Sequence, residues 1–413
     1  MKPVHTLYVC YFGLREPLVQ TQVLPYLRQL QTDTVQVSLL TFEPRLNETW
    51  TTEEISRHRE ELKAEGISWH LLKYHKRPSL PATLYDIVIG AWTIHQLMRR
   101  ENVTVLHARN HVPAFMSAIA RVFNDGKMIF DIRGFMPEEY TDSGVWPENG
   151  YLYRGLKAVE RYLLRTSNAF VLLTQKAKEI IFPGAEDDDV RGRPIEVIPC
   201  CVDLQRFAAA AQVAKEELRK ELNLTKRRVI IYAGSFGGSY MTSEMTDFLA
   251  VAHRQDPSTF SIILTQSPKD SVTGRLRESG INEKDYMITQ VSPGRVPHYL
   301  KAADIAISFI KPCYSRQSSS PTKIAEYLAS GLPVICIAGV GDLDALIEGN
   351  NAGALLREFS PEAYGAALDQ VDRMRADSQL SERLRKLAEQ QFDLVTVGRI
   401  RYRRLYERLL KNE

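Results

Sequence analysis

The sequence has few cysteines, and no pattern among them marks a metal site or a disulfide framework. There are five, at Cys10, Cys200, Cys201, Cys313 and Cys336, an odd number without Cys-x-x-Cys spacing. Such a set argues against a disulfide-stapled secreted domain and against the common zinc sites. We therefore expect a cytoplasmic protein that holds no metal.

Long apolar runs are also missing. Residues 7–12 are apolar, but they lack a small-residue cleavage site and are soon followed by Arg15, so they do not form a secretory signal. Residues 83–98 are interrupted by Asp86 and His95. We find no stretch suited to spanning a membrane, for which about 20 apolar residues are needed.

Charge of one sign does not dominate either. Lys and Arg number 53 and Asp and Glu 50, and the net charge of +3 gives no support for nucleic-acid binding. With 44% hydrophobic and 25% charged residues, the composition is typical of a soluble globular protein. A chain of 413 residues is too long for one ordinary core, so we expect two or three domains.

What the sequence does contain is a regular alternation of short apolar runs with segments of helical period. This alternation is typical of parallel sheets covered by helices. The expected strands form a first series at 7–12, 35–42, 67–72, 103–107, 128–132 and 169–173, and a second at 229–233, 260–264, 286–289, 305–309, 334–338 and 354–356. We therefore predict an α/β protein with two Rossmann-like, doubly wound domains facing each other across a cleft.

The expected linker lies between the two series, in a segment rich in Asp, Gly and Pro at 186–207. This places an N-terminal domain at 1–195 and a C-terminal domain at 200–394. An arginine-rich helical segment, 395–413, remains after the last strand.

Loops that follow the strands are the candidates for a site, because ligands of open α/β sheets bind beyond the carboxyl ends of the strands. Gly13, after the first strand, permits close approach of the backbone to a ligand. Two pairs of residues spaced by two end the fourth and fifth strands, and each pair lies on one side of its strand; the pairs are His107 with Arg109 and Asp131 with Arg133. They indicate either catalytic groups that face the cleft or a structural ion pair with a core histidine.

The turn YAGSFGGSY, residues 232–240, opens the second domain between a strand and a helix. Its small residues form a predicted cradle for an oxyanion. They are Gly234, Ser235, Gly237 and Gly238. The turn lacks the GxGxxG spacing and the lysine of a P-loop, so neither a dinucleotide nor an NTPase site is supported.

The stretch SSSPTKIAEYLASGLPVI, residues 318–335, places a lysine in the first turn of a predicted helix. Ser320 is the expected N-cap, which makes Thr322 the second and Lys323 the third helical residue, and Gly331 ends the helix. A cation there meets the positive end of the helix dipole, at a cost of about 0.3–1 kcal/mol. An anion held between Lys323 and the helix end would reverse that cost. The alternative is a lysine that extends into water.

Two other charged segments carry simpler expectations. The acidic triplet 187–189 lies in the linker, and we expect a solvated loop there rather than a metal site. A basic stripe runs along one predicted helix at Arg154, Lys157, Arg161 and Arg165. Glu160 interrupts it, so a solvated face is the default expectation and contact with an anionic membrane the alternative.

The two-domain pattern and three sequence segments resemble the GT-B retaining glycosyltransferases of family 4, over nearly the whole chain. The segments are VIPCCVDLQRF at 197–207, VPHYLKAADIAIS at 296–308, and the stretch at 318–335. In that family a C-terminal helix crosses back onto the first domain, a role that 395–413 is placed to fill. We expect Ile400, Leu405 and Leu409 to be its buried residues.

The resemblance implies a nucleotide-diphosphate sugar as donor. Many members carry two glutamates eight residues apart, where this chain has Ser318 and Glu326, and Glu326 would hold the ribose. An active-site imidazole or its replacement is implied near His107 and Arg109. The groups that would hold the diphosphate are Lys323, Arg316, Ser319, Ser320 and Thr322.

The function implied is retaining, metal-independent hexosyl transfer to a glycan or lipid-linked acceptor in polysaccharide biosynthesis, with no cofactor besides the donor and with peripheral membrane contact left open. Two alternatives remain. A GT-B sugar-nucleotide epimerase would need a carboxylate pair, for which Asp131 and Glu138 are candidates. A nucleotide-sugar-binding subunit without turnover is suggested by Ser318, and also by the absence of the Arg and Lys that many members carry after the first strand of the second domain, where this chain has Ser235, Phe236 and Gly237. Nucleic acid is not an expected partner, because aromatics are not interleaved with a strong basic patch.

Overall fold

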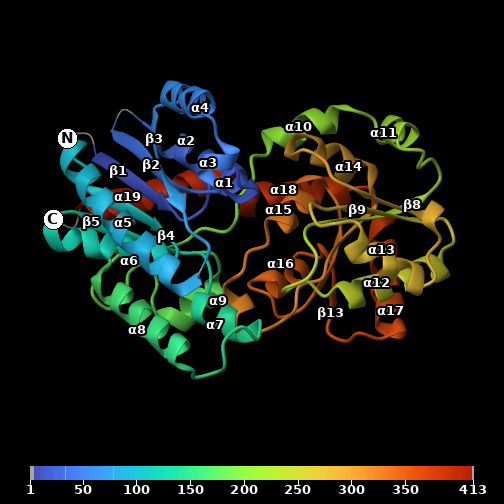
Figure 1. Ribbon diagram of the computed structural model, residues 1–413. Coiled ribbons are helices and arrows are strands. Elements are labelled where there is room, and N and C mark those ends of the chain that lie inside the picture. The colour runs from blue at the N-terminus through green and yellow to red at the C-terminus, as the bar shows by residue number, and fades with distance from the viewer. Residues whose placement is uncertain (1–3, 33, 78, 412–413) are drawn as a thin grey trace. The chain divides into compact units, whose positions relative to one another are not determined.

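The computed structural model describes residues 4–32, 34–77 and 79–411, and the chain divides into two units (Figure 1). Unit 1 comprises Met1–Pro199 with Leu394–Glu413, and unit 2 comprises Cys200–Asp393. The boundaries expected from the sequence, 195–200 and 394–395, lie beside these divisions. The C-terminal segment belongs to the first unit, where Tyr402 and Tyr406 contact Asp131 and His107.

Unit 1 is built on seven parallel strands in the order β3-β2-β1-β4-β5-β6-β7. The strands are β1 (Val4–Cys10), β2 (Val35–Pro44), β3 (Ile67–Tyr74), β4 (Val105–Arg109), β5 (Lys127–Ile132), β6 (Ala169–Leu172) and β7 (Ile195–Val197). The last of these lies inside the expected linker. Three residues carry too little pattern to be recognised, and β7 becomes a strand because it pairs with β6.

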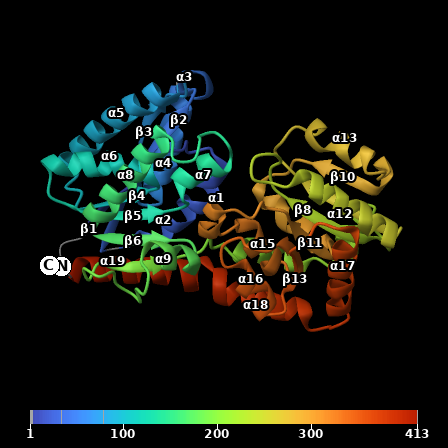
Figure 2. The ribbon, with the colours of Figure 1, turned by 90° about the horizontal axis from the view of Figure 1, so that it is seen from below.

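Helices cover both faces of this sheet. They are α1 (Pro17–Gln22), α2 (Leu24–Leu30), α3 (Leu46–Thr49), α4 (Thr52–Ala64), α5 (Ser79–Arg100), α6 (His111–Ala120), α7 (Met136–Asp142), α8 (Tyr151–Thr166), α9 (Gln175–Ile181) and α19 (Ile400–Lys411). Figure 2 shows α19 running beside the strands of unit 1, where it contacts β7.

A π-helical segment, Leu394–Arg399, precedes α19 and changes the phase of the helix. Leu405 and Leu409 are buried as expected, whereas Ile400 is 53% exposed. The prediction for Ile400 is wrong because this residue lies five positions before Leu405 in the same helix, which places it about 140° away from the buried side.

Unit 2 has six parallel strands in the order β10-β9-β8-β11-β12-β13. They are β8 (Arg228–Ala233), β9 (Thr259–Leu264), β10 (Tyr286–Thr289), β11 (Ile305–Ser308), β12 (Val334–Ile337) and β13 (Gly353–Leu356). Its helices are α10 (Gln205–Gln212), α11 (Lys215–Glu221), α12 (Thr242–Gln255), α13 (Asp270–Glu278), α14 (Val296–Ala302), α15 (Thr322–Ala329), α16 (Leu343–Gly349), α17 (Pro361–Arg375) and α18 (Leu380–Phe392).

The prediction of an α/β fold with two Rossmann-like parts is confirmed by these two sheets. The strands read as continuous apolar runs because both of their faces are covered, and every residue of β11 and β12 is buried. In the described chain, no helix combines the length and the apolar character needed to cross a bilayer.

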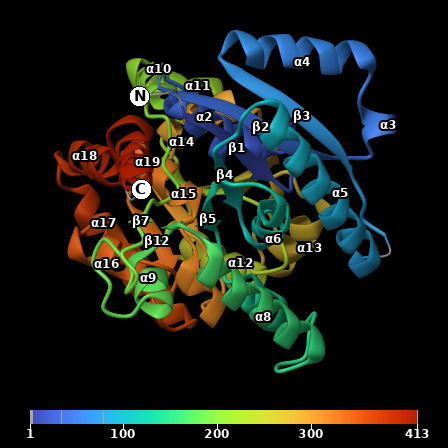
Figure 3. The same cartoon turned by 90° about the vertical axis from the view of Figure 1, so that its left-hand side faces the viewer.

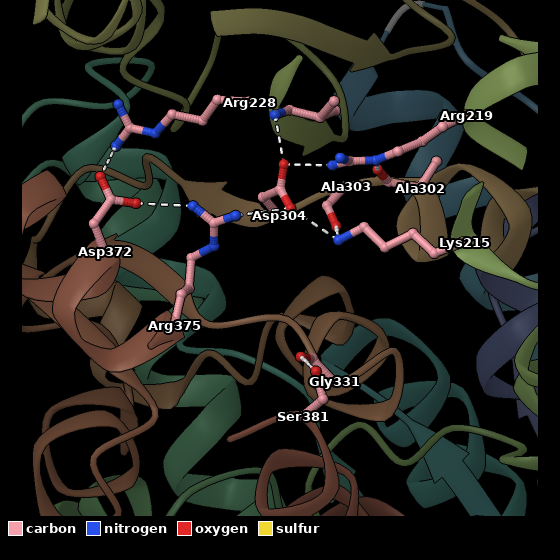
Figure 4. Close-up of polar contacts among 11 residues, drawn as sticks. Lys215, Arg219, Arg228, Ala302, Ala303, Asp304, Gly331, Asp372, Arg375 and Ser381 are labelled. Atoms are coloured by element: carbon pink, nitrogen blue, oxygen red, sulfur yellow. Dashed lines mark hydrogen bonds and ion pairs between the residues drawn. The ribbon is translucent and has the colours of Figure 1, made fainter. Parts of the chain in front are cut away.

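The amino end of β11 in unit 2 holds a cluster of ion pairs around Asp304 (Figure 4). This carboxylate lies 2.8 Å from Lys215 Nζ and 2.9 Å from Arg375 Nη2, and it also accepts a hydrogen bond from Arg219. It accepts the backbone N–H of Val229 at 2.8 Å as well. Asp304 therefore joins α11, α17 and the start of β8 to the strand that it precedes.

Candidate active site

The strand order of unit 2 reverses between β8 and β11, which are neighbours in the sheet. The chain leaves their carboxyl ends toward opposite sides, and the crevice formed at such a point is where open α/β sheets bind ligands. The loop after β8 contains Gly234, Gly237 and Gly238. The loop after β11 leads through a short 3-10 turn, Tyr314–Ser318, to α15.

These two loops are tied to each other. Tyr240 forms an antiparallel bridge with Ile310. Arg316 donates a 2.5 Å hydrogen bond from Nη2 to the hydroxyl of Ser239, and its Nη1 lies 3.5 Å from the hydroxyl of Ser319. The guanidinium of Arg316 is thus held between the loops, as part of the same cluster as the small residues of the 232–240 turn.

Tyr327 fixes the position of α15 against the sheet. Its hydroxyl accepts the N–H of Ala233 at 2.8 Å and donates to the carbonyl of Ile307 at 3.3 Å. The hydroxyl therefore joins β8 to β11 at the point where the two strands separate. Tyr327 is not among the residues expected from the sequence, although its place four residues after Lys323, on the same side of the helix, is a usable signal.

Lys323 is enclosed rather than solvated. Its side chain is 8% exposed, and its ammonium has no hydrogen-bond partner among the described residues. Nζ lies 4.4 Å from the ring centre of Tyr232 and 4.5 Å from that of Tyr240. A Cβ atom at Gly234 would come within 2.4 Å of Nζ, so the lysine occupies the space that the glycine leaves open. The structure thus differs from the alternative in which this lysine extends into water.

Burial controls the electrostatics of this cluster. It lowers the pKa of Lys323 to about 7, although the nearby Glu326 carboxylate opposes the change. Burial likewise raises the pKa of Glu326, against the influence of Arg206 and Lys323. Arg206 Nη1 lies 3.6 Å from Glu326 Oε1. A cation that is buried without a hydrogen-bond acceptor is well suited to receive an anion.

The start of α15 differs from the expected one. The helix begins at Thr322 with Pro321 in the cap position, no side chain caps its first turn, and Lys323 is its second residue. Ser320 accepts the N–H of Cys200 at 3.1 Å instead of capping the helix. The prediction of a serine cap is wrong because Pro321 already has an extended conformation and takes the cap position itself. Gly331 follows the helix with a φ of +75°, as expected of a helix stop.

The other predicted donor-binding residues are distributed unevenly. Gly237 and Gly238 are exposed and have φ values of +78° and +59°, a left-handed conformation that favours glycine. Ser235 is exposed and its carbonyl accepts a hydrogen bond from Tyr232 at 2.6 Å. Ser318 is buried and donates to a carbonyl within its own turn at 2.7 Å, so its hydroxyl is already engaged.

The two polar pairs of unit 1 form a buried network. His107 and Asp131 are fully buried, and His107 Nδ1 lies 3.0 Å from the hydroxyl of Tyr406 on α19. Tyr402 of the same helix donates to Asp131 at 3.4 Å, and Tyr8 donates to it at 3.3 Å. The expectation that both pairs face a cleft is therefore wrong for His107 and Asp131, because α19 covers their side of the sheet.

Charge compensation completes this network. Burial alone would raise the pKa of Asp131, but Arg133, His107 and Arg109 hold it well below its usual range. Arg133 Nη1 lies 3.5 Å and Arg109 Nη1 4.0 Å from the Asp131 carboxylate. These contacts favour the second of the two expectations, a structural ion pair with a core histidine.

Gly13 is close to its own chain rather than open to a ligand. A Cβ atom there would lie 2.7 Å from Pro44 and 2.8 Å from the Glu43 carboxylate. Glu43 is buried, accepts the N–H of Leu14 at 2.9 Å, and has a pKa raised by burial. The close approach that the sequence suggested thus serves the packing of this loop on the end of β2.

No group of three or more His, Cys, Asp or Glu side chains in the described chain is placed to hold a metal. The acidic triplet at 187–189 pairs with arginines of unit 1 instead: Asp188 with Arg408 at 2.6 Å and Asp189 with Arg193 at 2.5 Å. A cavity of about 280 Å³ lies between α19 and the start of β1 and β2. It is at the amino ends of the strands, the opposite edge from the one where such sheets bind ligands.

Comparison with solved structures shows the same architecture over the whole chain. A glycosyltransferase from Rickettsia africae has a TM-score of 0.70 at 16% identity, with 100% of both chains covered. HepE from Anabaena in complex with UDP has a TM-score of 0.69 at 15% identity, covering 98% of this chain and 100% of that one. Sucrose-phosphate synthase from Thermosynechococcus elongatus has a TM-score of 0.74 at 13% identity, covering 99% and 100%.

Sequence comparison agrees with this architecture. Spore coat protein SA of Bacillus subtilis is 22% identical over 199 residues, so the match spans about half the length of that curated relative, 49%, and 45% of this chain. The profile of the glycosyl transferases group 1 matches residues 214–391, and that of glycosyltransferase family 4 matches residues 19–206. The chain is therefore a glycosyltransferase of group 1 with the GT-B fold.

Proposed function

We propose that this glycosyltransferase moves a sugar from a nucleoside-diphosphate sugar to a glycan or lipid-linked acceptor in polysaccharide biosynthesis, with retention of configuration and without a metal ion. The observation that carries the proposal is Lys323, whose buried amino group has no hydrogen-bond partner among the described residues and lies at the uncapped start of α15. Similarity to a protein solved with UDP and with UDP-glucose supports a nucleotide-sugar donor.

The proposed reaction breaks the bond between the anomeric carbon and the β-phosphate oxygen, and the electron pair leaves with the phosphate. The acceptor hydroxyl forms the new bond to the anomeric carbon, and its proton passes to the departing phosphate oxygen. Negative charge grows on the diphosphate as the bond breaks, so cations fixed beside it stabilise the transition state more than the bound donor.

Each group of the cluster has a role in this proposal. Lys323 and Arg316 contact the β-phosphate, and the exposed backbone at Gly237 and Gly238 lines the same anion. Glu326 accepts the ribose hydroxyls, which replace the weak 3.6 Å contact with Arg206 as its polar partners. Because Lys323 is already buried in the free protein, little of its side-chain entropy is lost on binding.

The epimerase alternative receives no support from the carboxylates that it needs. Asp131 is fully buried within its ion-pair network. Glu138 is also buried, accepts a hydrogen bond from Tyr153 at 3.1 Å, and pairs with Lys157 at 3.0 Å. Neither carboxylate is free to exchange a proton with a sugar ring.

The experiment that tests the proposal is a screen of radiolabelled UDP-, GDP- and ADP-sugars with the full chain. Binding, hydrolysis, epimerisation and transfer to lipid and glycan fractions are scored separately. We expect one nucleotide sugar to bind and to be hydrolysed slowly without acceptor. Binding without any turnover in the presence of acceptor fractions would favour a non-catalytic subunit, and an epimerised product would favour the epimerase.

Donor binding is expected to take up close to one proton per chain at pH 8. In the free protein the pKa of Lys323 is about 7, so its amine is mostly neutral at pH 8, and a bound diphosphate favours the charged form. Calorimetric titration in buffers of different ionisation enthalpy measures the uptake. The Lys323→Met variant is the control and should take up none.

The same lowered pKa makes a matching prediction about folding. Without donor, the unfolded chain binds more protons than the folded one between pH 7 and the ordinary lysine pKa near 10.4. Lys323 therefore raises the free energy of unfolding as the pH rises through that window.

In the calorimetric titration with donor, equal proton uptake by wild type and Lys323→Met would contradict an ammonium at the diphosphate.

Activity is expected to survive removal of divalent metal. The diphosphate is neutralised in this proposal by Lys323, Arg316 and the start of α15, so a bridging cation is unnecessary. Turnover measured with an excess of EDTA should remain within about twofold of the untreated rate, because these groups neutralise the diphosphate without a metal. Complete loss in EDTA, with recovery on adding Mg²⁺ or Mn²⁺, would show that a metal carries out the role assigned here to the cations.

A further inference from the structure

Three helices of unit 1 form a layer on one face of its sheet. Figure 1 and Figure 3 both show α6 between α5 and α8, and α6 contacts both helices as well as β4 and β5. We call the solvent side of this layer, residues 79–100, 111–123 and 151–166, the α5–α8 face. It includes η1 (Arg121–Phe123), the 3-10 turn that ends α6.

Large apolar side chains are exposed on parts of the α5–α8 face, although no residue of α6 itself is exposed. On α5 they recur at helical spacing, and others lie on η1 and at the start of α8. They are Leu84, Tyr85, Val88, Trp92, Val122, Phe123, Tyr151 and Leu152. Trp92 is 60% and Phe123 73% exposed. The ring of His95 lies 5.6 Å from Trp92 and 6.1 Å from Phe123, so the apolar residues of α5 and η1 adjoin. An exposed apolar patch of this kind indicates an interaction site.

The exposed charges within these three ranges are of one sign, and the nearest exposed carboxylates along the chain, Asp125 and Glu148, lie just outside them. Five arginines are exposed within the ranges, at Arg99, Arg100, Arg154, Arg161 and Arg165. Both carboxylates of these described ranges are buried. Asp86 accepts hydrogen bonds from Tyr11 at 2.7 Å and from the backbone of His75 at 3.0 Å.

Glu160 is the second buried carboxylate, and its burial changes the charge that the basic stripe on α8 exposes. It lies 3.0 Å from His111 Nε2 and also pairs with Lys157. Burial would raise the pKa of Glu160, but His111 and Lys157 hold it below its usual value. The negative charge that interrupts the stripe in the sequence is therefore turned inward and neutralised, and the exposed charged residues of α8 are all arginines.

A mixture of exposed aromatic rings and arginines, without exposed carboxylates, matches an anionic lipid surface. Trp and Tyr favour the boundary between headgroups and acyl chains, while arginines attract anionic headgroups and extend their apolar stems along the surface. A second copy of the chain is a poorer occupant, because a self-complementary interface would place these arginines against one another. We propose that the α5–α8 face docks the protein on the surface of an anionic membrane. The proposal rests on unit 1 alone and is independent of the donor site.

Sedimentation with vesicles tests this proposal. The full chain is mixed with vesicles of phosphatidylcholine alone or with 30% phosphatidylglycerol, a composition chosen to supply anionic headgroups at roughly physiological density. We expect binding only to the anionic vesicles, weakened by raising the salt from 0.1 to 0.5 M, about a halving of the screening length. Binding should also shift the emission of Trp92 to shorter wavelength.

Two variants separate charge from apolar contact. Exchange of Arg154, Arg161 and Arg165 for glutamine should weaken binding about 10²-fold, because each basic residue near a membrane contributes about fivefold. The matched control exchanges Arg57, Arg59 and Lys63 of α4, which are exposed and lie outside the face, and should leave binding within about threefold, as expected where no headgroup contact is lost. The double variant Trp92→Ser and Phe123→Ser should lose most of the binding and the spectral shift.

Donor binding by each variant serves as the test of folding, since none of these residues lies in the donor site. Absence of binding to anionic vesicles by a chain that still binds donor would overturn the proposal while leaving the proposed function intact. Equal binding by the α8 and α4 triple variants would overturn it too. A concentration-dependent dimer that Trp92→Ser abolishes, seen by sedimentation velocity, would assign the face to a second copy instead.

Discussion

Replacing Lys323 with methionine is expected to lower turnover by about 10² to 10³ at saturating donor, the usual loss when one fixed donor to a developing oxyanion is removed. Methionine retains much of the apolar stem that packs against Tyr232 and Tyr240, so the space beside Gly234 stays filled. The ammonium is lost, and it is the group that interacts more strongly with the phosphate as charge grows on it. Initial rates under saturating donor and acceptor measure the effect.

Stability provides the internal control for this variant. The amino group of this lysine is buried without a hydrogen-bond acceptor, so methionine should leave the melting temperature unchanged or raise it. Lys386→Met, on the solvent side of α18, is the matched control and should change neither quantity. Near-wild-type turnover in Lys323→Met, with unchanged affinity for donor, would contradict the contact between this lysine and the phosphate.

Replacing Asp304 with asparagine is expected to lower the free energy of unfolding of unit 2 by about 3 kcal/mol. Removing one partner of a buried charge network costs about 3–5 kcal/mol, because the remaining charges stay desolvated without compensation. The lower end applies since Lys215 and Arg375 are 32% and 31% exposed and keep part of their hydration. Urea unfolding followed by circular dichroism measures the change.

A matched control separates burial from charge. Glu221→Gln removes a carboxylate of the same unit that lies 3.3 Å from Arg295. The side chains of this pair are exposed, 55% for the arginine and 59% for the glutamate. Exposed pairs contribute about 0–1 kcal/mol, so this variant should be close to wild type. Equal losses of unfolding free energy in the two variants would show that the location of Asp304 among α11, α17 and β11 does not increase its contribution to stability.

Acidification should reduce the difference between wild type and Asp304→Asn. Burial would raise the pKa of Asp304, yet Lys215 and Arg375 hold it below its usual value. A carboxylate with a lowered folded-state pKa contributes its full stability above the ordinary aspartate pKa of about 3.9 and loses it as the pH falls toward the folded value. The two proteins should therefore converge as the solution becomes more acidic than that ordinary value.

Local sequence was sufficient to predict most strands and the class of the fold. Every apolar residue of β5 and β12 is buried. A short run of β-branched and other apolar residues between turns is typical of a strand that is covered on both faces. The alternation of such runs with amphipathic helices then leaves a doubly wound sheet as the natural arrangement. The interest of Lys323 could also be recognised locally, because a lysine in the first turn opposes the helix dipole.

Local sequence could not show which polar side chains remain accessible. His107 and Asp131 end their strands as a catalytic pair would. Tyr402 and Tyr406 of α19 nevertheless cover them, although 271 positions separate Asp131 from Tyr402 in the sequence. Periodicity indicates that two residues share a side of a strand. It contains no information on what that side is packed against.

The sequence by itself thus determined the two α/β parts, the loops that follow their strands, and the lysine in the first turn of α15. Only the tertiary structure decided that Lys323 is enclosed by Tyr232 and Tyr240, that the polar pairs of unit 1 are internal, and that Glu160 is buried against His111 and Lys157. The physical reason is that strand and helix preferences arise from neighbours within a few residues. Burial, and with it the charge state and reactivity of a polar group, depends on elements that meet only when the chain has folded.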